Sequence, residues 1–112
     1  MAKYAEIRTT AWKIFSVPHT VALPAVAGTP TEIDCTADQI IAVALTFESR
    51  MHWTVAADAA TAVTQFAAGQ YEDSRGAGRL QIDVSNETRK LYVRAAGAAV
   101  ALGLSWTLIE GV

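Results

Sequence analysis

The chain has 112 residues, of which 52% are hydrophobic and 18% are charged, and its formal net charge is −2. This length is typical of one domain with one hydrophobic core, and the apolar fraction excludes an intrinsically disordered chain. Both charge signs are spread along the chain with no basic block, which argues against nucleic-acid binding. No apolar run reaches the roughly 20 residues of a membrane helix, so no membrane partner is expected.

The start of the chain and its cysteine content indicate where it is made. Residues 1–6 are polar and carry no apolar signal segment, and Cys35 is the single cysteine. A lone thiol excludes an intrachain disulfide and a cysteine-based zinc site, and it is typical of a reducing compartment. We therefore expect synthesis in a cytoplasm.

Residues 1–30 form a segment of mixed character. The stretch from Thr9 to Phe15 is mostly β-branched or aromatic, which favours a strand. All three prolines follow in residues 17–30, which predicts an irregular connection. We expect residues 1–30 to be an N-terminal arm and loop that packs either on its own domain or on a neighbouring subunit. Residues 31–112 would form the β-domain.

Residues 31–56 show a period of two. Ile33 and Cys35 alternate with polar residues, and residues 39–48 are apolar on both faces, as in a covered strand. A second alternating run follows at residues 51–56, after a short break. The brief connection predicts a hairpin between these two strands.

Residues 57–69 are ambiguous between a helix and a strand. Asp58 could cap a short helix, with Val63 and Phe66 three residues apart on one face. Threonine and valine weaken the helical case, and the rest of the chain resembles strands. We expect a small-residue loop and a short strand here.

The remainder of the chain alternates cleanly between apolar and polar or small residues. Strands are predicted at residues 80–84, 91–95 and 100–109, and residues 90–109 are expected to form the final hairpin. Short strands at even spacing with turns between them indicate an all-β sandwich or barrel of about seven to eight strands, mostly antiparallel.

The outward side of the last strand carries no charge. Ala101, Gly103, Ser105, Thr107 and Ile109 alternate with the apolar set, and residues 95–109 contain no charged residue. Solvent-facing strands normally carry charges that prevent aggregation. We therefore expect this face to be covered by a second layer or by another subunit. The high alanine content, 22 residues, also favours added burial against neighbours.

No catalytic or metal-binding pattern stands out. His19 and His52 have no partner at a recognisable spacing and are expected at the surface, and Cys35 is expected in the core. An enzyme or metal protein would require these three residues to converge in one pocket. Trp53 and Trp106 are expected in the core, whereas Trp12 and Tyr92 are the better candidates for surface contact.

Part of the chain resembles a known class of protein. Three segments within residues 51–108 resemble small all-β structural proteins of tailed-bacteriophage virions, of the capsid decoration (cement) type. The segments are Trp53-Thr54-Val55-Ala56-Ala57-Asp58, Phe66-Ala67-Ala68-Gly69-Gln70-Tyr71 and Leu91-Tyr92-Val93-Arg94. The resemblance implies a β-sandwich or jelly-roll that forms oligomers, often trimers. It also implies a terminal arm or loop that reaches a neighbour.

These observations predict a non-enzymatic capsid decoration protein on the virion surface, with no cofactor. Its partners would be further copies of itself and the major capsid protein or another virion protein. The alternatives are another phage head or tail component, or a carbohydrate-binding or adhesin-like β-module. The interface residues predicted from the sequence are Trp12, Ile14, Phe15, Leu23, Tyr92 and Ile109.

Overall fold

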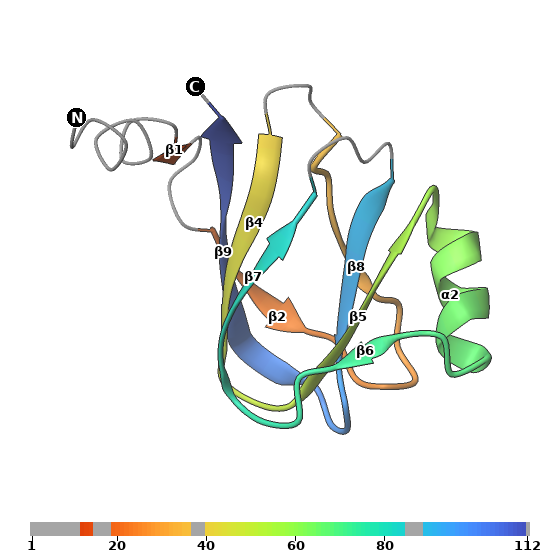
Figure 1. Ribbon diagram of the computed structural model, residues 1–112. Coiled ribbons are helices and arrows are strands. Elements are labelled where there is room, and N and C mark those ends of the chain that lie inside the picture. The colour runs from red at the N-terminus through yellow and green to blue at the C-terminus, as the bar shows by residue number, and fades with distance from the viewer. Residues whose placement is uncertain (1–11, 15–18, 37–39, 85–88, 112) are drawn as a thin grey trace, which may run out of the picture.

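The computed structural model describes residues 12–14, 19–36, 40–84 and 89–111. Within these ranges the chain forms nine strands and one helix (Figure 1). The strands are β1 (Trp12–Ile14), β2 (His19–Leu23), β3 (Thr31–Ile33), β4 (Ile40–Phe47), β5 (Met51–Ala56), β6 (Glu72–Asp73), β7 (Gly78–Asp83), β8 (Lys90–Ala95) and β9 (Val100–Gly111). Helix α2 (Ala59–Ala67) lies between β5 and β6.

The strands form two antiparallel sheets. Sheet A has the order β1-β9-β4-β7, with β2 beside β1 along the same edge of β9, and sheet B has the order β3-β8-β5-β6. From β2 onward, each strand lies in the sheet opposite its predecessor, except β6, which stays in sheet B beside β5. This strand order is that of a jelly roll, which confirms the expected all-β sandwich.

Both predicted hairpins are wrong. Strand β4 lies in sheet A and β5 in sheet B, and β8 and β9 are likewise in opposite sheets. The two connections are arches that carry the chain across the core (Figure 1). A short connection between two alternating strands has the same sequence pattern whether it forms a hairpin within one sheet or an arch between two sheets. The pairing partners come instead from distant strands: β4 pairs with β9, and β5 pairs with β8.

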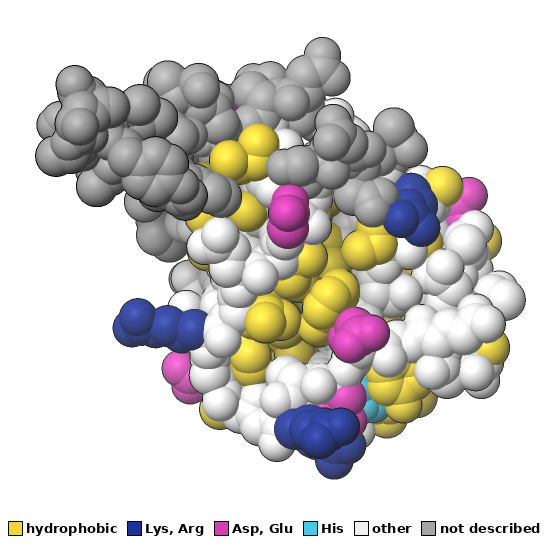
Figure 2. All heavy atoms as spheres, in the orientation of Figure 1, with side chains coloured by type: hydrophobic (Ala, Val, Ile, Leu, Met, Phe, Trp, Pro, Cys, Tyr) yellow, Lys and Arg dark blue, Asp and Glu magenta, His cyan; other side chains and the backbone are white. Residues whose placement is uncertain are grey.

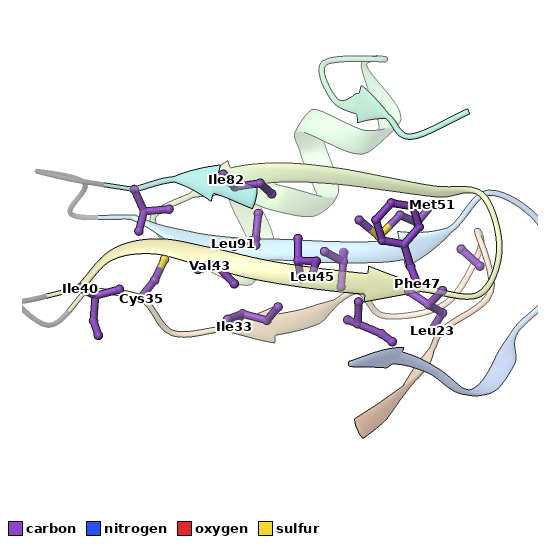
Figure 3. Close-up of a cluster of buried hydrophobic side chains, with 14 residues drawn as sticks. Leu23, Ile33, Cys35, Ile40, Val43, Leu45, Phe47, Met51, Ile82 and Leu91 are labelled. Atoms are coloured by element: carbon purple, nitrogen blue, oxygen red, sulfur yellow. The ribbon is translucent and has the colours of Figure 1, made fainter. Parts of the chain in front are cut away.

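The hydrophobic core fills the space between the two sheets (Figure 3). Val43, Leu45 and Phe47 point inward from β4, and Leu91 and Val93 face them from β8. These side chains come from positions two apart, as the period of a strand requires. The complete cluster is Leu23, Ile33, Cys35, Ile40, Val43, Leu45, Phe47, Met51, Ile82, Val84, Leu91, Val93, Ala95 and Leu104.

Residues 59–67 are a helix, which corrects the expected loop and strand. Asp58 caps the helix by accepting a hydrogen bond from the backbone N–H of Thr61 at 2.8 Å. Ala62 and Phe66, four residues apart, are buried against the outer face of sheet B, whereas Val63 is exposed. Tertiary packing on one face therefore outweighs the modest helix propensity of this segment.

Part of the N-terminal segment belongs to the sandwich. Strands β1 and β2 both pair with β9. The strand expected at residues 9–15 is described only as β1, and its other residues lie outside the described ranges. The division of the chain at residue 30, and an arm that contacts another subunit, stay predictions.

Strand β9 contains an irregularity where it crosses the end of the sandwich. The register with β2 shifts between Val21 and Leu23, opposite residues 100–104 of β9. A Cβ atom at Gly103 would lie 2.6 Å from Cγ1 of Val100. Glycine is therefore required here by the close approach of Val100 to the backbone.

Candidate interaction surface

The outer face of sheet A is the surface that the sequence pattern singled out. Because Val43, Leu45 and Phe47 point into the core, the intervening residues of β4 point outward, and the register places three residues of β9 beside them. We call the following set the small-residue face: Ala42, Ala44, Thr46, Ser105, Thr107 and Ile109.

The small-residue face carries no charged side chain. Thr46 is exposed, Ala44 and the three β9 residues are half-buried, and Ala42 is buried. Between β4 and β7 this face is hollowed, with a volume of about 370 Å³ lined by Ala44, Leu45, Thr46, Arg79, Leu80 and Gln81. Small side chains across two central strands permit close approach of another flat surface. The charged residues stand at the margin, on β7.

The predicted interface residues are placed differently from one another. Ile109 is half-buried on the small-residue face, and β1 is paired so that Ile14 lies opposite Ile109 and Trp12 opposite Gly111. Phe15 lies outside the described residues. Leu23 is 0% exposed and belongs to the core, which corrects its expected place as a surface anchor. An interface role for Trp12, Ile14, Phe15 and Ile109 stays a prediction.

Tyr92 is also buried, contrary to the expected surface position. Its side chain is 1% exposed and packs with Ala56, Ala62 and Phe66 beneath helix α2. The hydroxyl donates a hydrogen bond to Oε1 of Glu32 at 2.8 Å. Burial and this bond raise the pKa of Tyr92 to about 12. The outward face of β8 was expected to meet solvent, but the helix covers it.

A polar network lies beside the helix on the outer face of sheet B. Arg94 donates to Nδ1 of His52 at 3.3 Å and to the backbone oxygen of Val26 at 3.1 Å. Its guanidinium lies 4.3 Å from the ring centroid of Phe66, and His52 stacks on Tyr71 with the centroids 4.2 Å apart. The network joins β5, β8, α2 and the loop after β2.

Electrostatics favours a neutral His52 in this network. The residue is 6% exposed, and desolvation together with Arg94 lowers the pKa of His52 below its ordinary value. Asp73, 3.9 Å from Nε2 of His52, forms an ion pair with Arg50, and hydrogen bonds from Arg50 lower the pKa of Asp73 well below its usual range. His52 was expected at the surface. It points away from the core, but Tyr71, Arg94 and Asp73 lie against it and leave it buried.

The candidate catalytic residues do not converge. His52 lies on the outer face of sheet B, Cys35 is in the core and donates to the backbone oxygen of Arg89 at 3.6 Å, and His19 stacks on Trp106 in sheet A. Among the described residues, no group of three potential metal ligands occurs. The same part of the chain contains no helix long and apolar enough to cross a membrane.

One side of the sandwich is open between β7 and β5. Figure 2 shows hydrophobic side chains at the surface there, and Trp53, Val55 and Leu80 are the half-buried residues that flank the core at these strands. Trp53 was expected in the core, and it is only partly buried, packed against the core cluster. The open side was missed because alternation gives the face of a strand but not its neighbours.

Comparison with solved structures finds a distant structural likeness to a virus coat protein. No protein-family model matches the chain, and no curated protein is similar to it in sequence. The structure is similar to that of the Tobacco streak virus coat protein dimer, with 9% identity and a TM-score of 0.43 over 89% of this chain and 84% of that chain. The fold assignment rests on the strand order of the two sheets.

Proposed function

We propose that this protein is a non-enzymatic virion structural protein of the capsid decoration type, which binds other copies of itself and a capsid surface. The single observation that carries the proposal is the small-residue face of sheet A. A solvent-facing sheet normally carries charged side chains, and this one presents alanine, serine and threonine across β4 and β9. Such a face suits a broad, flat contact with another protein.

Two further points support the proposal. Jelly rolls are common in viral capsid proteins, although lectin domains and cupins share the fold, so this support is by analogy alone. The tailed-phage assignment rests on the sequence resemblance over residues 51–108. Decoration requires only attachment, and many copies on one lattice raise the effective strength of a modest contact.

The test is sedimentation of the tagged chain from its native host, followed by electron microscopy of the fast-sedimenting fraction. The expected result is the chain on capsid particles. Thr107→Lys places a charge in the middle of the small-residue face. This variant is expected not to attach to capsids and therefore to stay in the slowly sedimenting fraction. Thr64→Lys, on the exposed side of helix α2, is the matched control and should sediment like the wild type. A wild-type chain absent from particles contradicts the proposal.

A carbohydrate-binding function is the second candidate, and one observation favours it. A hollow of about 250 Å³ is lined by Trp53, Thr54, Val55, Gln70, Tyr71 and Glu72, which combines aromatic rings with amide and carboxylate groups. This function predicts that glycans quench tryptophan fluorescence and that Trp53→Ala abolishes the quenching. A glycan screen that finds no binding at millimolar concentration contradicts a carbohydrate-binding function.

A further inference from the structure

A small hollow lies between helix α2 and the loop that follows β2. Its volume is about 150 Å³, and its lining includes Val26, Pro30, Val63, Phe66, Ala67 and Arg94. Among the side chains that the structure describes, the most exposed large hydrophobic ones are Val26 at 39% and Val63 at 51%, and both belong to this lining. A concave site with an apolar lining and one charged group is typical of a ligand-binding site. We call this feature the Arg94 hollow.

Both walls of the Arg94 hollow are held by contacts within the fold. On the loop side, the N–H of Val26 donates to the backbone oxygen of Gly97 at 2.9 Å. The backbone oxygen of Pro24 accepts from the N–H of Ala95 at 2.8 Å. On the helix side, Phe66 is buried and anchors α2 to sheet B. A preformed hollow loses little free energy to the ordering of its walls when a ligand binds.

Arg94 is a half-buried cation without a carboxylate partner. Arg50 forms an ion pair with Asp73. Nζ of Lys90 lies 3.5 Å from the carboxylate of Glu32. No carboxylate among the described residues pairs with Arg94, which is half-buried and is the charged member of the lining. A cation that is partly withdrawn from water among apolar side chains favours the binding of an anion.

The guanidinium of Arg94 is fixed in place but keeps unused donors. A guanidinium carries five N–H groups. Nε and Nη2 both lie 3.3 Å from Nδ1 of His52, and Nη1 donates to the backbone oxygen of Val26 at 3.1 Å. Nη1 and Nη2 each retain one N–H group with no acceptor among the described residues. Because the guanidinium also lies 4.3 Å from the centroid of the Phe66 ring, its orientation is set before any ligand arrives.

We infer that the Arg94 hollow binds a small monocarboxylate whose apolar group is compact and branched. The carboxylate oxygens would accept from the unused N–H groups of Nη1 and Nη2, which is the pairing that a guanidinium favours. The apolar group would cover the exposed side chains of Val26 and Val63. One positive charge matches one negative charge, whereas a phosphate dianion would leave a charge unpaired.

The volume limits the size of the apolar group. An apolar cavity of roughly 150 Å³ holds a molecule of the size of benzene, so an isobutyl group fits in this hollow. A carboxylate with an isobutyl group occurs in free short-chain acids such as isovalerate, and at the end of a polypeptide whose last residue is leucine. The site lies on the outer side of sheet B, whereas the small-residue face belongs to sheet A, so the inference does not depend on the proposed function.

A titration followed by NMR of the methyl groups of Val26 and Val63 tests the site. Isovalerate is expected to shift these signals saturably, with a Kd of about 0.1–1 mM. Isovaleramide has the same shape without the charge, and acetate has the charge without the isobutyl group. Each is expected to bind about tenfold more weakly or less well still, because each lacks one of the two contacts.

A second ligand distinguishes the two sources of the carboxylate. N-acetylleucine carries the carboxylate and the isobutyl group together with an amide, as the end of a polypeptide does. Tighter binding of N-acetylleucine than of isovalerate supports a polypeptide end as the ligand. Equal or weaker binding supports a free acid.

Variants of the lining provide a matched pair. Val63→Glu places a carboxylate at the hollow, where it competes for Arg94, and is expected to weaken isovalerate binding about tenfold or more. Thr64→Glu makes the same charge change at the next residue of the helix, which is exposed and outside the lining, and should bind like the wild type. Arg94→Lys keeps the charge without the planar pair of donors and should also weaken binding.

The outcomes separate this site from the contact with capsids. Circular dichroism checks folding, and if Arg94→Lys does not fold, Val63→Glu and the comparison with isovaleramide decide the matter. A wild-type chain that shows no saturable shift with either acid up to about 20 mM contradicts the inference. Equal binding of isovalerate and isovaleramide, or binding that Val63→Glu leaves unchanged, also contradicts it. A chain that binds isovalerate but does not attach to capsids supports this site and contradicts the proposed function.

Discussion

Arg94 donates a hydrogen bond through Nε to Nδ1 of His52 at 3.3 Å, so the imidazole accepts a hydrogen bond from a permanently charged guanidinium. A proton on Nδ1 would face this guanidinium directly. The same guanidinium holds the backbone oxygen of Val26 and lies over the ring of Phe66. The protonation state of one histidine is thereby coupled to the attachment of the loop and of helix α2.

Acidification is expected to destabilise the protein through His52. The groups that face it are Arg94, Arg50, Asp73 and Tyr71, and desolvation with Arg94 lowers its pKa from the ordinary 6.5. The unfolded chain then binds a proton that the folded chain does not, so the free energy of unfolding falls as the pH falls through 6.5 toward the folded-state pKa. Urea unfolding between pH 8 and 5 measures this. His52→Gln keeps a hydrogen-bond acceptor but does not titrate, so it should reduce the change in the free energy of unfolding with pH. If the free energy of unfolding changes equally with pH in both proteins, the prediction is contradicted.

Loss of the helix cap is expected to lower stability. Asp58 accepts from the N–H of Thr61, and Asp58→Ala leaves this donor without its partner, at a cost of about 1 kcal/mol. Asp58→Asn keeps an accepting oxygen and should cost less. Chemical denaturation of the two variants beside the wild type checks the difference, and equal midpoints for all three would refute a role for the cap.

Gly103 is expected to be intolerant of a side chain. A Cβ atom would lie 2.6 Å from Cγ1 of Val100, so Gly103→Ala requires a shift of β9 and should cost about 1–3 kcal/mol. Gly97→Ala is the matched control, since a Cβ there meets no atom within 4 Å. Thermal unfolding should show a lower Tm for the first variant and little change for the second.

Leu23 and Ile109 are expected to separate stability from binding. Leu23→Ala removes a fully buried side chain and should lower the free energy of unfolding by about 2–5 kcal/mol. Ile109→Ala alters the small-residue face and should destabilise less, while it weakens attachment to capsids. Unfolding and sedimentation of both variants check this; an unaltered stability for Leu23→Ala would place that residue outside the core.

Several features of the fold could be predicted from the sequence because they depend on neighbouring residues. The period of two in residues 43–47 and 100–109 follows from the alternation of side chains along a strand, and it correctly separated Leu104 from Ser105. The uncharged outward side of β9 was found in the same way. The inward position of Cys35 also follows from this period.

The helix and the hairpins show the limit of local patterns. Residues 59–67 become a helix because Ala62 and Phe66 find an apolar surface at Tyr92 and Ala56, which no local propensity reveals. The arch between β8 and β9 differs from a hairpin only in which sheet receives the second strand. That choice depends on pairing with distant strands, through contacts of large sequence separation.

The sequence by itself determined an all-β domain, the two faces of its main strands and an uncharged face on the last strand, since each depends on side chains a few residues apart. Only the tertiary structure decided which strands are neighbours, that Tyr92 and His52 are covered, and that β7 is the last strand in the order of sheet A among the described residues. Those features arise when segments far apart in the chain compete for the same apolar surfaces and the same backbone hydrogen bonds, and the lowest free energy is a property of the whole fold.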